Sequence, residues 1–317
     1  MENRKLGVGL AESAGTSESK ERYVDLLTDS GFKAVFGDQQ NKQVLIDLLN
    51  AVLPAGRQVI DLTYSTTELR PATLGRKTFV LDLRCEDVDG SIYVVELQKY
   101  GQEHFFKRCV AYAARLFASQ PLRGVKDYDL PPVYLIGILA KDRVGSFGTD
   151  RGDRILSEFA LREKETGANP PDTISLTFIE LAGFTKTLDK CETIVDKWCY
   201  SFKNMSRLDR LPEDLQLDIF QRLFKAAEIA QFTHEKRIQY DKDMMTELDW
   251  ENVLYTAEHR GEQRGLKSGL HRGEASAKAT IARNLHKDGF SVEKIAELAE
   301  LPAEQVTAIL EAADGAV

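Results

Sequence analysis

The sequence predicts an α/β fold in which a mixed sheet flanked by helices is followed by an all-α C-terminal region. Up to about residue 185, the residue patterns follow the order helix, three strands, helix, two strands, which is typical of a sheet covered by helices. Within this part, residues 133–140 form a continuous apolar run, as expected for a buried strand. Beyond residue 185 every pattern is helical.

The individual elements follow from apolar periodicity and from the residues that begin and end helices. Asp29 can cap a helix that begins near Ser30, and Pro54 ends a second helix over residues 42–53. Residues 141–170 are charged and rich in Gly, which predicts a surface excursion or a mobile loop. Strands are expected over residues 59–68, 79–86, 91–98, 133–140 and 174–181, and a long helix over residues 102–120.

The strands over residues 79–86 and 91–98 have the pattern of a hairpin. A three-residue loop, Val88-Asp89-Gly90, places Gly90 where a positive φ is needed. This register sets Asp82 opposite Glu96, with Cβ atoms about 4.5–5.5 Å apart, and Gln98 diagonally beside them on the same face. Two carboxylates this close repel each other and lose solvation, and a divalent cation would relieve both effects. Oxygen ligands of this kind suit Mg²⁺ or Mn²⁺.

A simpler interpretation is that both carboxylates lie on a partly exposed polar face of the hairpin. This interpretation would be preferred for an isolated hairpin. The neighbours expected on the same face, Val80, Ile92 and Val94, are apolar and favour burial instead. The sequence therefore favours a buried acidic pair.

An Asp on one strand and Glu-x-Gln on the next resemble the core of the PD-(D/E)XK nucleases. More narrowly, the chain resembles the recombination-promoting nuclease and transposase family over roughly residues 25–313. Residues 28–38 resemble the opening helix of that family, residues 48–53 follow where expected, and residues 188–198 with the Gly-punctuated tail are also similar. Two departures stand out, because Leu81 replaces the Pro before Asp82 and Gln98 replaces the usual Lys.

The resemblance implies a metal-dependent endonuclease acting on DNA, with roles in recombination, mobile elements or defence. Asp82, Glu96 and the backbone carbonyl of Leu97 are then expected to hold Mg²⁺ or Mn²⁺. Gln98, which is common at this position in the resembled family, is expected to orient the attacking water or a ligand carboxylate. Lys99 cannot replace the missing Lys, because alternation along a strand points it to the opposite face.

Three further site residues are expected on helices. Arg108 and Tyr112 occur on the helix after the Glu strand, as in the resembled family, and Arg108 is expected to bind phosphate and stabilise its charge. Lys33 either contacts DNA or extends its stem along the surface. Asp29 is assigned to the helix cap.

The main rival is a non-catalytic protein with the same fold. A neutral amide at Gln98 can orient a water but supplies no positive charge. The same chain would then be a catalytically weak or inactive module that binds DNA or supports an assembly.

Composition limits the class of protein further. The chain has 317 residues, of which 43% are hydrophobic, and a net charge of −8, which argues against a broadly basic nucleic-acid coat. No apolar run approaches the ~18 residues of a membrane span, and a secretory leader is not apparent. The four Cys lack metal or disulfide spacing, so a cytoplasmic, reduced protein is expected.

We expect five segments. Residues 1–22 are expected to be disordered, residues 23–185 to form the nuclease-like core, residues 186–256 a helical extension, residues 257–278 a Gly-repeat helix or linker, and residues 279–317 a small helical module. The repeat places a small residue at every fourth position from Ala257 to Ala277. The repeat is either a line of small residues along a helix, which would pack closely against another helix, or a flexible charged linker.

The last segment imitates a helix-turn-helix in its spacing. Its would-be recognition helix carries Glu304, Gln305 and Glu311 and no basic residue, which argues against phosphate binding. A packing or self-association module is favoured, and with it a homo-oligomer formed through the C-terminal helices.

Overall fold

The computed structural model describes residues 21–54, 56–69, 78–120, 129–141, 143–144, 154–168, 170 and 172–314. Residues 1–20 of the segment expected to be disordered lie outside this description. The chain divides into two compact units, Met1–Met244 and Met245–Val317. The division falls within α6 (His234–Lys287), the longest helix of the described residues.

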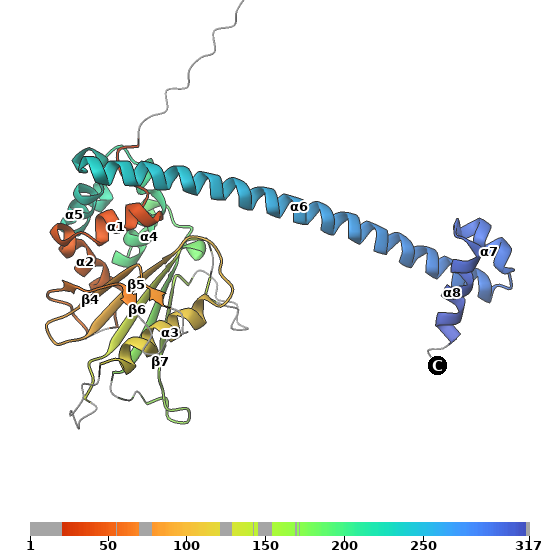
Figure 1. Cartoon of the computed structure of the whole chain (residues 1–317), viewed down its shortest axis with the longest axis horizontal. Coiled ribbons are helices and arrows are strands. Elements are labelled where there is room, and N and C mark those ends of the chain that lie inside the picture. Colours follow the sequence, from red (N-terminus) through yellow and green to blue (C-terminus); the bar gives the residue numbers. More distant parts are fainter. Residues whose placement is uncertain are drawn as a thin grey trace, which may run out of the picture. The chain divides into compact units, whose positions relative to one another are not determined.

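A six-stranded mixed sheet forms the centre of the first unit (Figure 1). The strands, in their order across the sheet, are β1 (Thr63–Tyr64), β4 (Leu83–Glu86), β5 (Ile92–Gln98), β6 (Val133–Leu139), β8 (Ile174–Glu180) and β7 (Leu156–Ala160). β5, β6 and β8 are parallel, whereas β1, β4 and β7 pair in antiparallel fashion with their neighbours. β2 (Glu68–Leu69) and β3 (Phe79–Val80) form a separate antiparallel pair. The predicted α/β class with a mixed sheet is confirmed.

Helices cover both faces of this sheet (Figure 1). One face packs against α1 (Asp29–Phe36), α2 (Lys42–Val52), α4 (Ile194–Asn204) and α5 (Asp218–Ala227). The other face packs against α3 (Phe105–Ala118). Short 3-10 helices connect these elements at Gln39–Asn41, Leu181–Gly183, Leu188–Lys190, Met205–Arg207, Glu213–Leu215 and Ile229–Gln231.

Alternation along β5 decides which side chains meet which helix layer. Tyr93 and Val95 belong to the apolar cluster that includes α1, α2, α4 and α5, whereas Ile92 and Val94 belong to the cluster that includes α3. Because successive side chains of a strand point to opposite faces, Glu96 follows Val94 onto the α3 side.

The hairpin has the predicted register. Leu83 pairs with Val95, so the next position outward sets Asp82 opposite Glu96. The turn is closed by hydrogen bonds from the Asp87 N–H to the Ser91 carbonyl and from the Gly90 N–H to the Asp87 carbonyl, each 3.0 Å long. Gly90 has a φ of 83°, which explains why glycine is needed there.

Several expectations about this unit were wrong. The described part of residues 141–170, expected to be a surface excursion or mobile loop, contains the edge strand β7, whose buried Ser157 donates a hydrogen bond of 2.7 Å to Glu180 in β8. The strand expected over residues 59–68 is divided between β1 and β2, and the strand expected over residues 79–86 is divided between β3 and β4. In both cases the two parts belong to different sheets. Val80 in β3 is 64% exposed rather than buried.

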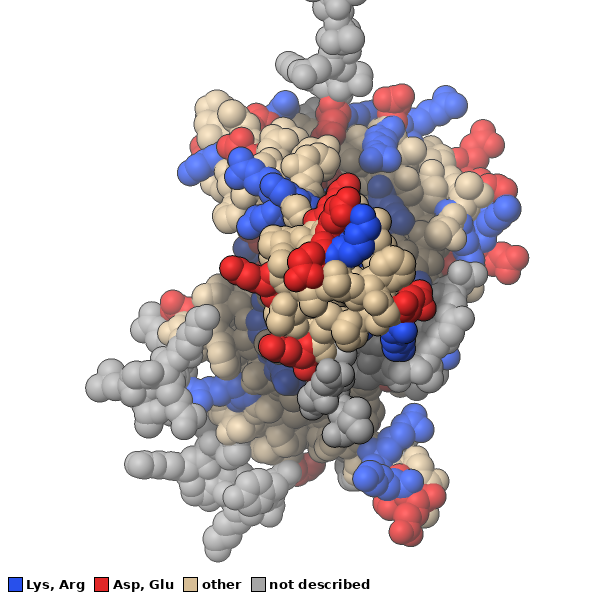
Figure 2. All heavy atoms as spheres, turned by 90° about the vertical axis from the view of Figure 1, so that its right-hand side faces the viewer, with Lys and Arg blue, Asp and Glu red and all other residues tan. Residues whose placement is uncertain are grey.

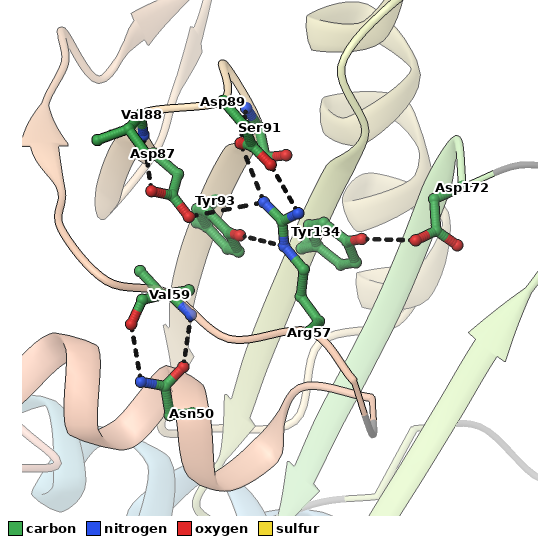
Figure 3. Close-up of polar contacts among 10 residues, drawn as sticks. All are labelled: Asn50, Arg57, Val59, Asp87, Val88, Asp89, Ser91, Tyr93, Tyr134 and Asp172. Atoms are coloured by element: carbon green, nitrogen blue, oxygen red, sulfur yellow. Dashed lines mark hydrogen bonds and ion pairs between the residues drawn. The ribbon is translucent and has the colours of Figure 1, made fainter.

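Arg57, in the segment after α2, joins that segment to the hairpin turn (Figure 3). Its Nε donates to the Tyr93 hydroxyl over 2.8 Å, and its Nη1 lies 2.7 Å from an Asp89 carboxylate oxygen. Its guanidinium also lies over the Tyr134 ring, 5.4 Å from the centroid, and the Tyr134 hydroxyl donates to Asp172 over 3.0 Å. Arg57 lowers the pKa of Asp89, chiefly through their hydrogen bond. One cation therefore holds the turn to the centre of the sheet.

The second unit contains the C-terminal part of α6 with α7 (Val292–Ala299) and α8 (Ala303–Asp314) around a small core of Ala282, Ile295 and Val306. Ser291 caps α7, because its side chain accepts the Lys294 N–H. Residues 257–278 lie inside α6. A Cβ added at Gly261, Gly265, Gly269 or Gly273 would meet no atom within 4 Å, so these glycines show no close helix packing in the described part of the chain. None of the described helices combines the length and apolar character needed to cross a membrane.

Replacing Arg57 with Ala should lower the free energy of unfolding by about 1–3 kcal/mol in urea titrations near pH 7, because two charge-assisted hydrogen bonds are lost. The loss should shrink as the pH falls below 3.8, the ordinary pKa of Asp89, because the stabilisation requires the ionised carboxylate. Arg237→Ala removes an exposed ion pair with Asp241 in α6 and is the control. Equal effects of the two substitutions would contradict the structural role of Arg57.

Candidate active site

Asp82, which is partly buried, and Glu96, which is buried, form an acidic pair joined through the backbone. The Asp82 N–H donates to Glu96 Oε1 over 3.2 Å, and the Leu97 N–H donates to Asp82 Oδ2 over 2.7 Å. Glu96 is 3% exposed. The two strands therefore hold the two carboxylates side by side, as the hairpin register predicted.

Burial makes this pair hard to ionise. Burial, and then the nearby negative charge of Asp82, raise the pKa of Glu96 to about 8. Burial also raises the pKa of Asp82, although the Leu97 N–H and the charge of Lys33 act in the opposite direction. Carboxyl pKa values raised by burial in this way are common at functional sites.

Arg108, on α3, lies beside this pair. Its Nη2 donates to Gln98 Oε1 over 2.8 Å and lies 3.9 Å from Glu96 Oε2, and its Nη1 contacts Gln102. The guanidinium carbon lies 4.9 Å from the centre of the Phe105 ring. The structure thus brings Arg108 and Gln98 together at the acidic pair, with the arginine partly exposed.

Tyr112 lies one helical turn after Arg108 and supports it. Tyr112 is 7% exposed, and its ring packs against Phe79 with a centroid separation of 5.0 Å. The Arg108 guanidinium carbon lies 5.9 Å from the centre of the Tyr112 ring. Burial and, after it, the charge of Glu96 raise the pKa of the Tyr112 hydroxyl.

The helix α1 contributes Asp29 and Lys33, one turn apart. Lys33 Nζ lies 2.8 Å from each carboxylate oxygen of Asp29. Asp29 is not the cap that we expected, since the Thr28 hydroxyl caps α1 by accepting the Gly31 N–H over 3.1 Å. The two side chains form an i,i+4 ion pair on α1 in which both remain largely exposed.

Lys99 points away from the pair, as strand alternation predicted. It forms an ion pair of 3.8 Å with Asp25, on the other side of β5 from Gln98. The lysine next to Gln98 in the sequence therefore does not supply the missing charge.

The donor set suits a divalent cation with oxygen ligands. Among the described residues, no group of three or more His, Cys, Asp and Glu side chains is arranged to hold a metal ion. The set consists instead of two carboxylates and a backbone carbonyl. The N–H and C=O of one strand residue point to the same side, so the Leu97 carbonyl points toward Asp82 as its N–H does. Two buried carboxylates with raised pKa values are the environment that a cation would stabilise.

Glu96→Gln should stabilise the metal-free protein at pH 7–8 by about 1–3 kcal/mol, measured by urea unfolding in EDTA. In the folded state the pKa of Glu96 is raised from 4.5 to about 8. As the pH rises from 4.5 to 8, ionisation of Glu96 therefore favours the unfolded chain more and more and lowers the free energy of unfolding. Below pH 4.5 this effect is absent. The gain should therefore fade as the pH approaches 4.5. Glu158→Gln, on the exposed side of β7, is the control and should show no such gain.

The family of the chain can be identified on this basis. A family model described as PD-(D/E)XK nuclease family transposase matches residues 26–257, which include α1, the Asp82–Glu96 hairpin, Arg108 and Tyr112. No curated protein and no solved structure matches the chain. Since the matched residues make up more than half of the sequence, the chain belongs to the family of PD-(D/E)XK nuclease family transposases.

Proposed function

We propose that this protein is a metal-dependent endonuclease that hydrolyses phosphodiester bonds in DNA. The observation that carries the proposal is the buried Asp82–Glu96 pair, whose carboxyls both have raised pKa values and lie beside Arg108. Family membership supports the reaction class. The transposase-like family also supports a role in recombination, mobile elements or defence.

Asp82, Glu96 and the Leu97 carbonyl would hold Mg²⁺ or Mn²⁺. A cation bound there polarises a phosphoryl oxygen and lowers the pKa of a bound water. The protein supplies the fixed geometry, because two backbone hydrogen bonds hold the carboxylates in place.

Gln98 and Arg108 act as a unit in this proposal. The Gln98 carbonyl oxygen accepts from Arg108 and its Nε2 donates to the Tyr100 carbonyl over 2.6 Å, so Gln98 fixes the guanidinium in one orientation. Arg108 then stabilises the negative charge that develops on the phosphate, and Tyr112 supports the arginine stem. This assignment differs from the expectation that Gln98 orients the water directly.

Contact with DNA must be local. The net charge is −8, and Figure 2 shows basic and acidic side chains interspersed on the face that it displays. Arg108 and Lys33 are the phosphate-binding residues in our proposal. Arg108 lies beside Glu96, and the positive charge of Lys33 lowers the pKa of Asp82 and of Glu96. DNA is therefore expected to bind through a few charges at the site rather than across a broad basic surface.

The alternative is a protein that binds DNA or supports an assembly without cleaving it. The observation that favours it is Gln98, a neutral residue where a catalytic lysine is usual. Metal-dependent cleavage distinguishes the two.

Plasmid nicking with Mg²⁺ or Mn²⁺ tests the proposal. Asp82→Ala should abolish nicking, a loss of at least about 10³-fold, because the metal site loses one of two carboxylates. Glu158→Gln, exposed on β7, should leave the rate unchanged. Circular dichroism should show that every variant is folded. If well-folded wild-type protein fails to nick several DNA forms with either cation, the protein is not the proposed nuclease.

We further propose that a second copy of the chain binds along α6. Leu248, Tyr255, Leu266 and Leu270 are separated by spacings that align them along one side of a helix, and they are 56%, 69%, 78% and 63% exposed. Self-association would remove this apolar stripe from water.

Leu266→Glu combined with Leu270→Glu should reduce self-association of the full chain. Charges in an apolar helix seam lose solvation without gaining partners. Light scattering after size exclusion would report the mass. Lys267→Glu, beside the stripe, is the control. A monomeric wild-type chain, or an unchanged mass in the double variant, would contradict this mode of assembly.

A further inference from the structure

Arg108 lies beside a buried carboxylate and yet does not form a hydrogen bond with it. Its Nη2 is 3.9 Å from Glu96 Oε2, which is beyond hydrogen-bond distance. The Glu96 side chain is only 4% exposed, so little water competes for it. A charged hydrogen bond between a guanidinium and a carboxylate is roughly twice as strong as a neutral one. Other contacts therefore keep the guanidinium away from Glu96.

Two amide oxygens make these contacts. Arg108 Nη2 donates to Gln98 Oε1 over 2.8 Å, and Arg108 Nη1 donates to Gln102 Oε1. The Gln98 amide is itself fixed, because its Nε2 donates to the Tyr100 carbonyl over 2.6 Å. Both terminal nitrogens of the guanidinium therefore point to neutral acceptors. We refer to Gln98 and Gln102 as the amide clamp.

The other neighbours of Arg108 do not set its direction. The guanidinium carbon lies 4.9 Å from the centre of the Phe105 ring and 5.9 Å from that of Tyr112. A ring face attracts a cation but leaves a guanidinium free to turn, whereas an amide oxygen fixes one particular nitrogen. The Nε atom is buried and has no hydrogen-bond partner among the described residues. The amide clamp is thus the directional restraint on Arg108.

The turn before α3 brings Gln102 to this place. The Phe105 N–H donates to the Gln102 carbonyl over 3.1 Å, and the Arg108 N–H donates to the His104 carbonyl over 3.0 Å. His104 has a φ of 71°, in the left-handed region that residues with a Cβ rarely adopt. Such a conformation persists where the surrounding structure requires it, and it is commonest near functional sites. This turn lets the Gln102 side chain meet a guanidinium from the second turn of the helix.

The position of Arg108 matters for a divalent cation. Glu96 is one of the two carboxylates that would hold Mg²⁺ or Mn²⁺ in the proposed site. A guanidinium bonded to Glu96 would occupy an oxygen that the cation needs, and its charge would repel the cation. At 3.9 Å, and with its side chain 31% exposed, Arg108 leaves this oxygen accessible and can still meet a phosphate from solvent.

We propose that Gln102 is a positioning residue of this site, which together with Gln98 withholds Arg108 from Glu96 and keeps that carboxylate available for a divalent cation. The inference rests on the metal site of the proposed nuclease function and deepens it. It also gives the neutral residue at position 98 a role, because a lysine there has no acceptor for the hydrogen bond from Arg108.

Gln102→Ala tests the inference when Mn²⁺ is titrated into the full-length, metal-free protein by isothermal titration calorimetry. The released guanidinium should bond to Glu96 and weaken Mn²⁺ binding about tenfold, a loss typical of changes just outside a metal's ligands. Gln102→Glu retains an acceptor oxygen and should bind Mn²⁺ at least as tightly as the wild type.

Gln239→Ala is the matched control. Gln239 also bonds to a charged side chain, because its Nε2 donates to Asp243 over 2.8 Å on the exposed surface of α6. Its loss should change Mn²⁺ binding less than about twofold, as expected for a surface substitution. Circular dichroism should show that every variant is folded.

A double-mutant cycle separates the clamp from a general loss of structure. Arg108→Ala removes the competing guanidinium, so in that background Gln102→Ala should leave Mn²⁺ binding unchanged. A damaged turn before α3 would instead weaken binding in both backgrounds. Equal losses with and without Arg108, or an unchanged affinity in Gln102→Ala, overturn the inference.

Plasmid nicking at increasing Mn²⁺ concentration gives a second readout. Gln102→Ala should need about tenfold more Mn²⁺ to reach half of its maximal rate, because the cation now competes with Arg108 for Glu96. Arg108→Ala should lower the maximal rate about 10²-fold, since it removes charge from the phosphate. It should not raise the Mn²⁺ requirement.

The inference and the nuclease function fail in different ways. If the wild type nicks DNA and Gln102→Ala binds Mn²⁺ equally well, only the clamp fails. If the wild type binds Mn²⁺ but does not nick DNA, the nuclease function fails, whereas weaker Mn²⁺ binding by Gln102→Ala still supports the clamp. If the wild type binds neither Mn²⁺ nor Mg²⁺, the metal site and the inference fail together.

Discussion

The reciprocal hydrogen bonding of Asp82 and Glu96 is the constraint on which the rest of the site depends. Each carboxylate accepts a backbone N–H from the opposing segment, so neither can turn away from the other. This arrangement places two negative charges in a buried environment, and burial raises the pKa of both. A folded chain tolerates such a pair because the sheet and α3 are held together by other contacts.

Those contacts are distributed around the hairpin. The Gly90 turn sets the register, and Arg57 joins that turn to Tyr93 and Tyr134 at the far end of the strands. The apolar side chains of β5 alternate between two helix layers, which holds the strand from both sides. These contacts therefore supply the stability of the hairpin. They offset the cost of holding two carboxylates close together at the end of the hairpin near Asp82.

Positive charge reaches the acidic pair from the helix α3 rather than from the strand β5. Arg108 Nη2 lies 3.9 Å from Glu96 Oε2 and donates to Gln98 Oε1. Gln98 therefore restricts the position of this cation beside the carboxylates. Such preorganisation matters for phosphate chemistry, because a charge already in place needs no reorganisation when the transition state forms.

The sequence by itself determined the α/β class, the hairpin register and the opposition of Asp82 and Glu96, because turn geometry and strand alternation act over a few residues. It also placed Arg108 and Tyr112 on a helix after the Glu strand. Only the tertiary structure decided that residues 156–160 pair as an edge strand, that Val80 is exposed, and that Arg108 meets Gln98 beside Glu96. These features depend on packing between elements far apart in the chain, where local propensity carries no information about the partner.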